Sequence, residues 1–435
     1  MTSTEDRETV AYDPMAPAAK QDAESYWRVL REREPIHRFE IPAVNLELMA
    51  ANPMSGETVP EFYSVLRHKE LTEVLTNPKI YSSAEGVGPD RMVQVLDGGV
   101  LIWADDPTHL RQRRLAAKAF TPRAVEQLLP RIQATVDSVI DEIGASGSME
   151  VMQDLALPVS IRTITGIMGI PDGRSDDFWR WGNAIIGLFT VDQDAINAGL
   201  VGMMEMFDYV QVLVNAIRSG RADTIGPELD TGVLADLVRA EYEGSSLSDE
   251  ELKFFCLQLI VAGYETTSTA TVNGVQLLCT HPDQRAKFEQ ADDMGVRTAV
   301  EEIVRYISPL EGMFRTTTQD TELDGCPIPK GSKVRCVYAS ANRDERAFTD
   351  PHRFDIERDH AELRVHLGFG QGPHTCIGAA LARAELRIAL ETLFLRLPGL
   401  ELDPEHTPVR NTAFIINGFR ELHVRWDPAT VRDAG

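Results

Sequence analysis

A ten-residue run near the C-terminal end of the chain places one cysteine inside a loop that glycines bend. The run reads FGQGPHTCIG from Phe369 to Gly378, and a helix-forming stretch follows it. Gly370 and Gly372 allow backbone angles that a side chain would forbid, so the loop can turn tightly beneath a flat group. Backbone N–H groups and the positive end of the following helix would keep the sulfur of Cys376 ionised.

Three interpretations of Cys376 compete. A free cysteine is often buried, so a structural cysteine is the default when one is taken singly. A zinc site needs more ligands, and only His374 lies nearby in the sequence. The whole run, with Phe369, both loop glycines, His374, Cys376 and Gly378 in place, resembles the haem-binding signature of the cytochrome P450 monooxygenases. The resemblance implies haem b, with the thiolate of Cys376 as the iron ligand that favours O–O cleavage.

The longest predicted helix contains residues at its centre that disfavour helices. Ser248 and Glu251 fit a capping box, and the apolar pattern continues to Thr280, which predicts ~48 Å of helix at ~1.5 Å per residue. Its middle reads AGYETT over residues 262–267. A glycine inside a helix costs about 1 kcal/mol relative to alanine, and threonines add crowding. An unfavourable local sequence inside a strong element indicates function.

A purely structural interpretation of this run is a kink, a glycine for helix packing, or threonine hydroxyls that bond back to the helix backbone. The run also resembles the oxygen-binding segment of the cytochromes P450. That resemblance implies that Ala262 and Gly263 contact the haem, that the Thr266 hydroxyl steadies proton delivery to oxygen, and that Glu265 connects the pair to solvent. Tyr264 departs from the family, and its side chain would either narrow the pocket or belong to the core.

Charged residues elsewhere match further family features. Glu302 and Arg305 lie three apart on one predicted helix face, and with Arg353 in the later run PHRF they resemble the family's Glu–Arg–Arg triad, which would brace the cysteine loop. Haem propionates need cationic partners. The resemblance assigns that task to four residues: His109, Arg113, Arg315 and His374.

A cluster of basic residues lies close to these. Arg111, Arg114 and Lys118 follow one another along a predicted helix in an otherwise acidic chain. The bland interpretation is a solvated helix face. On the family fold the cluster would surface beneath the haem, where it would dock an acidic electron donor.

The pattern along the chain predicts a mainly α protein with small β-sheets (α+β), as in the cytochrome P450 fold with its long central helix over the haem and the cysteine loop. Residues 35–41 and 62–66 read as a strand pair, with an insertion between them. Helical periodicity dominates from 122 to 310, and short strands return over 321–339 and 414–426. No linker divides the chain, so we expect one domain over 1–435, with 1–20 as a flexible segment.

Composition excludes several classes of protein. The net charge of −24 over 435 residues argues against a nucleic-acid partner. Five scattered cysteines do not form a disulfide framework. Residues 1–20 are polar and carry neither a signal-peptide core nor a spanning helix, so we expect a soluble, cytoplasmic protein without a membrane partner.

The expected activity is insertion of one oxygen atom from O₂ into an apolar or amphipathic small molecule, by hydroxylation or epoxidation. Electrons would come from NAD(P)H through a separate ferredoxin and its reductase, because no flavin- or nicotinamide-binding segment is visible. The alternatives are a peroxygenase of the same fold driven by H₂O₂, which would not need Glu265 and Thr266, and a non-catalytic haem sensor or carrier. The expected pocket walls are four segments: 84–101, 179–206, 310–314 and 414–417. The substrate, its regio- and stereochemistry, and the oligomeric state stay open, since pocket loops are the least motif-bound part of such a chain.

Overall fold

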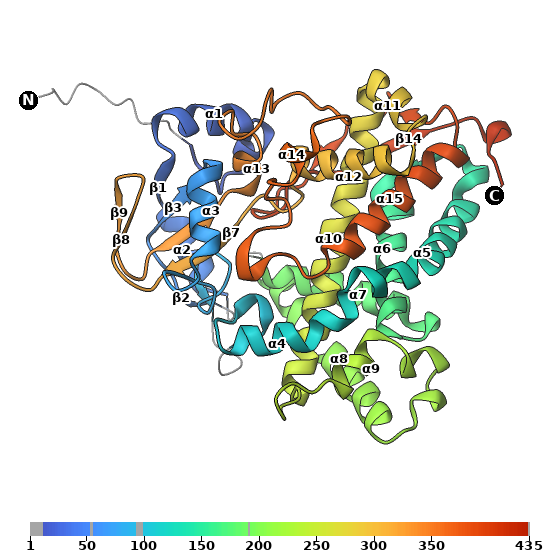
Figure 1. Cartoon of the computed structure of the whole chain (residues 1–435), viewed down its shortest axis with the longest axis horizontal. Coiled ribbons are helices and arrows are strands. Elements are labelled where there is room, and N and C mark those ends of the chain that lie inside the picture. Colours follow the sequence, from blue (N-terminus) through green and yellow to red (C-terminus); the bar gives the residue numbers. More distant parts are fainter. Residues whose placement is uncertain (1–11, 53–54, 93–98, 190–191, 434–435) are drawn as a thin grey trace, which may run out of the picture.

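The computed structural model describes residues 12–52, 55–92, 99–189 and 192–433. Helices make up most of the molecule, and a small sheet lies at one side of it (Figure 1). The predicted mainly α architecture with small β-sheets is confirmed.

The elements follow the expected order. The α-helices are α1 (Ala23–Arg33), α2 (Ala43–Ala50), α3 (His68–Thr76), α4 (Thr108–Ala116), α5 (Pro122–Ile143), α6 (Leu157–Met168), α7 (Ser175–Ile186), α8 (Gln193–Arg218), α9 (Val233–Arg239), α10 (Asp249–Thr280), α11 (Pro282–Phe288), α12 (Asp293–Ile307), α13 (Tyr338–Ala341), α14 (His360–Leu363) and α15 (Ala379–Arg396). The strands are β1 (Ile36–Glu40), β2 (Ser55–Glu57), β3 (Glu61–Val65), β4 (Tyr81–Ser82), β5 (Arg91–Met92), β6 (Ser148–Glu150), β7 (Met313–Thr317), β8 (Thr321–Leu323), β9 (Cys326–Ile328), β10 (Lys333–Cys336), β11 (Glu401–Leu402), β12 (Val409–Arg410), β13 (Phe419–Glu421) and β14 (His423–Arg425).

The largest sheet has five strands in the order β1-β3-β10-β7-β4. Its β1 and β3 pair antiparallel with Ile36 opposite Val65, which confirms the predicted strand pair. Strand β10 lies parallel to β3 and antiparallel to β7, so segments far apart in the sequence meet in this sheet. The segment between β1 and β3 forms α2 and β2, and β2 pairs with β5.

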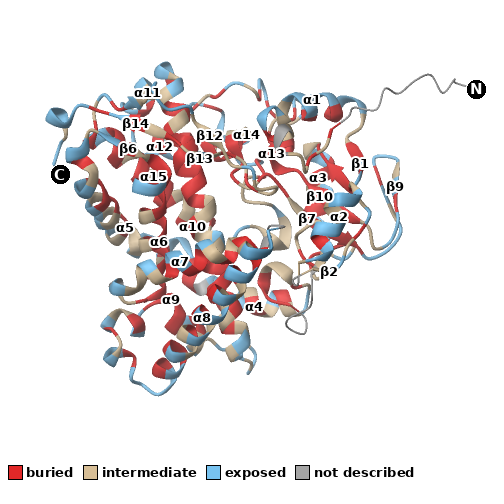
Figure 2. Ribbon diagram, turned by 180° about the vertical axis from the view of Figure 1, so that it is seen from behind, coloured by how far each residue is buried: buried red, intermediate tan, exposed pale blue. Residues whose placement is uncertain are grey.

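Helix α10 runs through the centre of the helical part and packs against α6, α8, α12 and α15. Both hydrogen bonds of its predicted capping box are present: Ser248 accepts from the N–H of Glu251, whose carboxylate accepts from the N–H of Ser248. Figure 2 shows buried residues concentrated along the helices that surround α10. A Cβ added at Gly263 would lie 3.3 Å from the Ile164 side chain of α6, so this glycine permits close helix packing.

The N-terminal segment differs from the expectation of a flexible stretch over 1–20. Residues 1–11 lie outside the described part of the chain, but Tyr12 and Lys20 are both buried. The indole N–H of Trp27 donates to the Tyr12 hydroxyl at 2.9 Å. The expectation was therefore wrong for residues 12–20, because an aromatic ring and an ammonium group anchor this stretch to the fold.

Glu385 in α15 is a buried carboxyl that faces α6. The hydroxyl of Ser160 donates a hydrogen bond to it. Burial raises the pKa of Glu385 to about 7, and the bond from Ser160 opposes the shift only in part. The folded protein therefore favours the neutral acid, whereas an unfolded chain ionises near the ordinary value of 4.5.

This difference predicts a pH dependence of stability. A raised carboxyl pKa means that the contribution is fully present below about pH 4.5 and is lost as the pH rises towards 7. At ~1.4 kcal/mol per pKa unit, the loss amounts to roughly 3 kcal/mol. Glu385→Gln keeps a neutral hydrogen-bonding group, so it should gain stability relative to the wild type between pH 5 and 7.5 in urea unfolding. Parallel stability curves for the two proteins would contradict the assignment.

Candidate functional site

The cysteine loop turns where glycines permit it. Gly370 and Gly372 both have positive φ, at 66° and 73°. A Cβ on Gly372 would lie 2.4 Å from the carbonyl oxygen of Leu75 in α3, so no other residue fits there without displacement. The N–H of Cys376 donates to the carbonyl of Phe369 at 2.8 Å and closes the loop.

The sulfur of Cys376 is enclosed by protein on most sides but is open on one. Its side chain is exposed, yet the surrounding protein desolvates the sulfur and so raises the pKa of the thiol. An exposed side chain and a desolvated sulfur are compatible only when open space touches one side of the sulfur and protein encloses the rest. The N–H of Gly378 and the charges of Arg113 and Arg383 oppose that pKa shift and favour the thiolate.

Helix α10 exposes a short window at the predicted oxygen-binding run. Ala262 is exposed, and Gly263, Glu265 and Thr266 are half-buried, although the helix is buried on either side of them. The window therefore borders open space in the interior. Helix α15, which begins directly after the cysteine loop, packs against α10 and brings the two parts of the site together.

Glu265 and Thr266, the acid and the alcohol in this window, differ in their hydrogen bonding. The hydroxyl of Thr266 donates to the carbonyl of Ala262 at 2.7 Å, as the purely structural interpretation of the run expects. Burial raises the pKa of Glu265. No hydrogen bond to its carboxyl is found within the described residues, so this group is free to bind a proton or water.

Tyr264 belongs to the core and not to the pocket. Its side chain is buried, and a Cβ added at Gly182 of α7 would lie 2.8 Å from the tyrosine ring. The ring therefore packs into a gap that this glycine leaves. Of the two orientations considered from the sequence, the structure shows the one that faces away from the exposed window.

The four cationic residues expected at the propionates converge. The rings of His109 and His374 lie 4.1 Å apart, and the guanidinium of Arg113 donates to the carbonyl of Thr375 at 2.7 Å. Burial lowers the pKa of His374 to about 2, and the positive charges of Arg315 and Arg113 add to the effect. Both histidines are therefore held neutral beside two arginines, since burial also lowers the pKa of His109.

These arginines have no carboxylate partner in the part of the chain that the structure describes. Arg315 is buried and donates to the carbonyl of Phe314, at 2.8 Å, and to the hydroxyl of Tyr338. The buried Nε2 atom of His109 has no hydrogen-bond partner among the described residues. Buried charge is normally paired, so this cluster fits a ligand that brings its own negative charges, as the two propionates of haem do.

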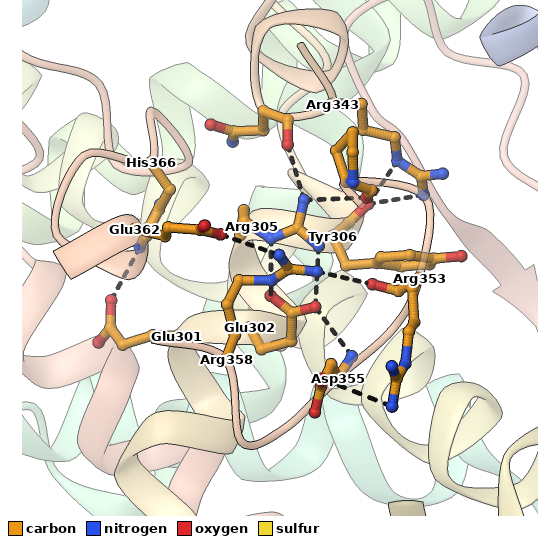
Figure 3. Close-up of polar contacts among 12 residues, drawn as sticks. Glu301, Glu302, Arg305, Tyr306, Arg343, Arg353, Asp355, Arg358, Glu362 and His366 are labelled. Carbon is orange, nitrogen blue, oxygen red and sulfur yellow. Dashed lines mark hydrogen bonds and ion pairs between the residues drawn. The ribbon is translucent and has the colours of Figure 1, made fainter. Parts of the chain in front are cut away.

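The predicted Glu–Arg–Arg triad is present with a different third member (Figure 3). Glu302 and Arg305 are fully buried, and Arg305 donates to both carboxylate oxygens at 2.6 and 2.8 Å. The second guanidinium on Glu302 belongs to Arg358, at 3.0 Å. Arg353 is 58% exposed, and its guanidinium forms an ion pair with Asp355, at 3.7 Å. The assignment of Arg353 was wrong because its side chain turns to solvent, while its backbone carbonyl accepts from Arg358.

The triad connects α12 to the cysteine loop. Arg305 also donates to the carbonyls of Asn342 and Pro351, at 2.7 and 3.1 Å. The Asn342 side chain in turn accepts from the N–H of Leu367 at 2.6 Å, two residues before Phe369. The carboxylate of Glu302 thus fixes the segment from which the loop starts.

The basic cluster on and after α4 offers fewer unpaired charges for docking a partner than expected. Arg111 is half-buried and forms an ion pair with Glu251, so part of its charge is balanced within the protein, and its place in a docking patch stays a prediction. Arg114 is exposed and lies over the ring of Tyr242, at 5.0 Å. The side chain of Lys118 is outside the described residues.

Two of the four expected pocket walls come together. Leu310 and Ile416 form an isolated β-bridge, and the N–H of Glu311 donates to the carbonyl of Ile415 at 2.7 Å. The other two expected walls, 84–101 and 179–206, are described only in part, since 93–98 and 190–191 fall outside the described residues.

Comparisons with known proteins agree with this geometry. The family model described as Cytochrome P450 matches residues 62–415. Cytochrome P450 monooxygenase PikC of Streptomyces venezuelae is 38% identical over 91% of this chain and 89% of its own. The 6-deoxyerythronolide B hydroxylase of Saccharopolyspora erythraea is 35% identical over 74% of this chain and 77% of its own. Among solved structures, the cytochrome P450 PksS of the Bacillus subtilis 168 bacillaene synthase has a TM-score of 0.82 at 28% identity, over 96% of this chain and 100% of that one.

The corrected triad predicts opposite outcomes for two nearby arginines. Arg358→Ala leaves part of the buried Glu302 charge uncompensated, which should cost about 3–5 kcal/mol in urea unfolding and reduce the haem content of the purified protein. Arg353→Ala removes an exposed side chain and should change stability by less than ~0.5 kcal/mol. Equal losses in the two variants would contradict the assignment of Arg358.

Proposed function

Because the chain belongs to the cytochrome P450 family, we propose that this haem-containing monooxygenase hydroxylates or epoxidises an apolar or amphipathic small molecule with electrons from a ferredoxin and its NAD(P)H-dependent reductase. The observation that supports the proposal most directly is the exposed window on α10, where a carboxyl and a hydroxyl border open space, as the side chain of Cys376 also does. A haem carrier or sensor would have no use for that pair.

The chain supplies the groups that would hold haem. Cys376 would provide the thiolate, and Arg113 and Arg315 would bind the propionates with His109 and His374 beside them. Phe369, Ala262, Gly263 and Gly378 would contact the macrocycle. Bound through a thiolate, haem supplies the activation of O₂.

Glu265 and Thr266 would move the protons that this chemistry consumes. The raised pKa of Glu265 keeps its carboxyl protonated closer to neutral pH than an ordinary glutamate, so it can deliver a proton and recover it from solvent. The hydroxyl of Thr266, which now donates to Ala262, can rotate to donate towards the interior space. An H₂O₂-driven peroxygenase would not require either group, and their presence favours the monooxygenase.

Three relatives support the substrate class by their names. They are a 6-deoxyerythronolide B hydroxylase, a methyl-branched lipid omega-hydroxylase and a steroid C26-monooxygenase. Steroids and branched lipids are largely apolar molecules. A spectral-shift screen of macrolides, steroids and lipids against this protein is the direct way to narrow the class.

We propose that the enzyme lies in the cytoplasm, because its bacterial cytochrome P450 relatives are generally soluble. Within the described chain, α8 alone is long and apolar enough to cross a membrane by length and composition. It packs closely against α7 and also against α10, as a helix of a soluble fold does.

The thiolate assignment predicts the spectrum of one variant. Cys376→Ser should lose the absorption band that reduced, CO-bound haem shows under thiolate ligation, because no other sulfur replaces it. Cys326→Ser, which changes a half-buried cysteine in β9, should keep the band and serves as the control. Retention of the band in the first variant would overturn the role of Cys376.

The proton pair predicts uncoupled turnover. Thr266→Ala should bind substrate normally and consume NADPH and O₂, while product falls and H₂O₂ rises in proportion. Glu265→Gln should instead slow O₂ consumption, because the proton supply upstream is restricted. Measurement of product and H₂O₂ per NADPH tests both. If Thr266→Ala gives the wild-type yield per NADPH, the threonine serves only the helix, and its bond to Ala262 is its whole role.

A further inference from the structure

One lysine near the N-terminus reaches across the fold to the turn 414–417. Lys20 lies in the 3₁₀ turn Pro17–Gln21 and is only 8% exposed. Its ammonium nitrogen lies 2.5 Å from a carboxylate oxygen of Glu311, 2.9 Å from the carbonyl of Phe414 and 3.2 Å from the carbonyl of Ile416. An ammonium has three N–H donors, so these three acceptors satisfy the group completely.

Glu311 binds a second cation on its other oxygen. The guanidinium of Arg335, from β10, donates to it and lies over the ring of Phe414, 4.3 Å from the ring centre. Phe414 also packs against Phe62 and Phe314, with ring centres 6.3 and 5.9 Å away. The cluster of Lys20, Glu311 and Arg335 therefore holds the turn at two backbone carbonyls and at one aromatic ring.

The backbone holds the same turn from the other side. The N–H of Asn417 donates to the carbonyl of Pro309 at 2.9 Å, and the carbonyl of Ile415 accepts from Glu311. Within the described residues, no group besides Lys20 donates to the carbonyls of Phe414 and Ile416. Lys20 is thus the contact that fixes these two peptide units, and their side chains with them.

We propose that Lys20 is a positioning residue of the substrate pocket. It holds the turn 414–417 against the segment 309–311, so that the side chains of the turn meet the substrate in one arrangement. This role rests on the proposed function, in which both segments are pocket walls. Loss of the lysine leaves Glu311 paired with Arg335, so the fold survives while the turn gains freedom.

Hydrogen exchange measures the freedom of the turn without any ligand. In the haem-loaded full-length protein, Lys20→Met should speed exchange of the amides in 411–418 by at least about fivefold, because these hydrogen bonds open more often. Lys20→Arg keeps a charged donor and should restore most of the protection. Lys330→Met removes an exposed lysine and should change nothing in this segment. Unchanged exchange in the Lys20→Met protein would overturn the proposal.

A series of imidazoles measures the effect on the pocket. Imidazole alone reaches the iron and should bind the wild type and Lys20→Met equally, by the shift in haem absorption. With 1-butyl-, 1-octyl- and 1-dodecylimidazole the tail reaches the walls, and the variant should lose about fivefold or more in affinity for the longest. A lower thermal midpoint with unchanged ligand discrimination would show a purely structural lysine and refute the role. A wild type that forms no oxygenated product from any tested substrate would instead refute the proposed function.

Discussion

The cysteine loop depends on one buried carboxylate. Glu302 carries a full charge at zero exposure, which is tolerable only because two guanidinium groups and the N–H of Asp355 surround it. These donors come from different parts of the chain. Arg305 also donates to the carbonyls of Asn342 and Pro351 and so links further segments to Glu302. Movement of any of these segments would leave the buried charge unpaired and would cost free energy. The position of the cysteine loop therefore follows from the need to keep the carboxylate of Glu302 paired and hydrogen-bonded.

In the cationic cluster at the interior space, by contrast, the buried charges are not paired with carboxylates of the protein. Arg113 and Arg315 lack carboxylate partners among the described residues, although the chain carries 67 acidic side chains. Self-pairing of these arginines would have been easy in such a chain. Cations left without a counter-charge lower the cost of binding a dianionic cofactor, and they disfavour protonation of His374, whose pKa they help to depress to about 2. Charge balance is thus complete within the protein around Glu302, whereas at Arg113 and Arg315 a bound ligand would complete it.

Features carried by one contiguous run could be predicted from the sequence, and features that need a distant partner could not. The capping box at Ser248 and the bent loop around Cys376 are local, since spacing and residue type determine them. The third arginine was misassigned because Arg353 and Arg358 close two successive turns of one irregular segment, and only the tertiary fold decides which side chain points inward. The ion pairs of Arg111 and Lys20 could not be predicted for the same reason, because their partners Glu251 and Glu311 lie 140 and 291 residues away.

Helix geometry explains how Tyr264 fits beside the oxygen-binding run. Residues at i, i+3 and i+4 share one helix face, so Ala262, Glu265 and Thr266 line the exposed window together. A residue at i+2 is turned ~200° away from the first, which directs Tyr264 towards Gly182 of α7. The large ring therefore leaves the window unchanged, and what it constrains is α7, where only a glycine leaves room for it. The departure from the family at this position is accommodated by helix packing, and the face that carries the proposed proton pair is unchanged.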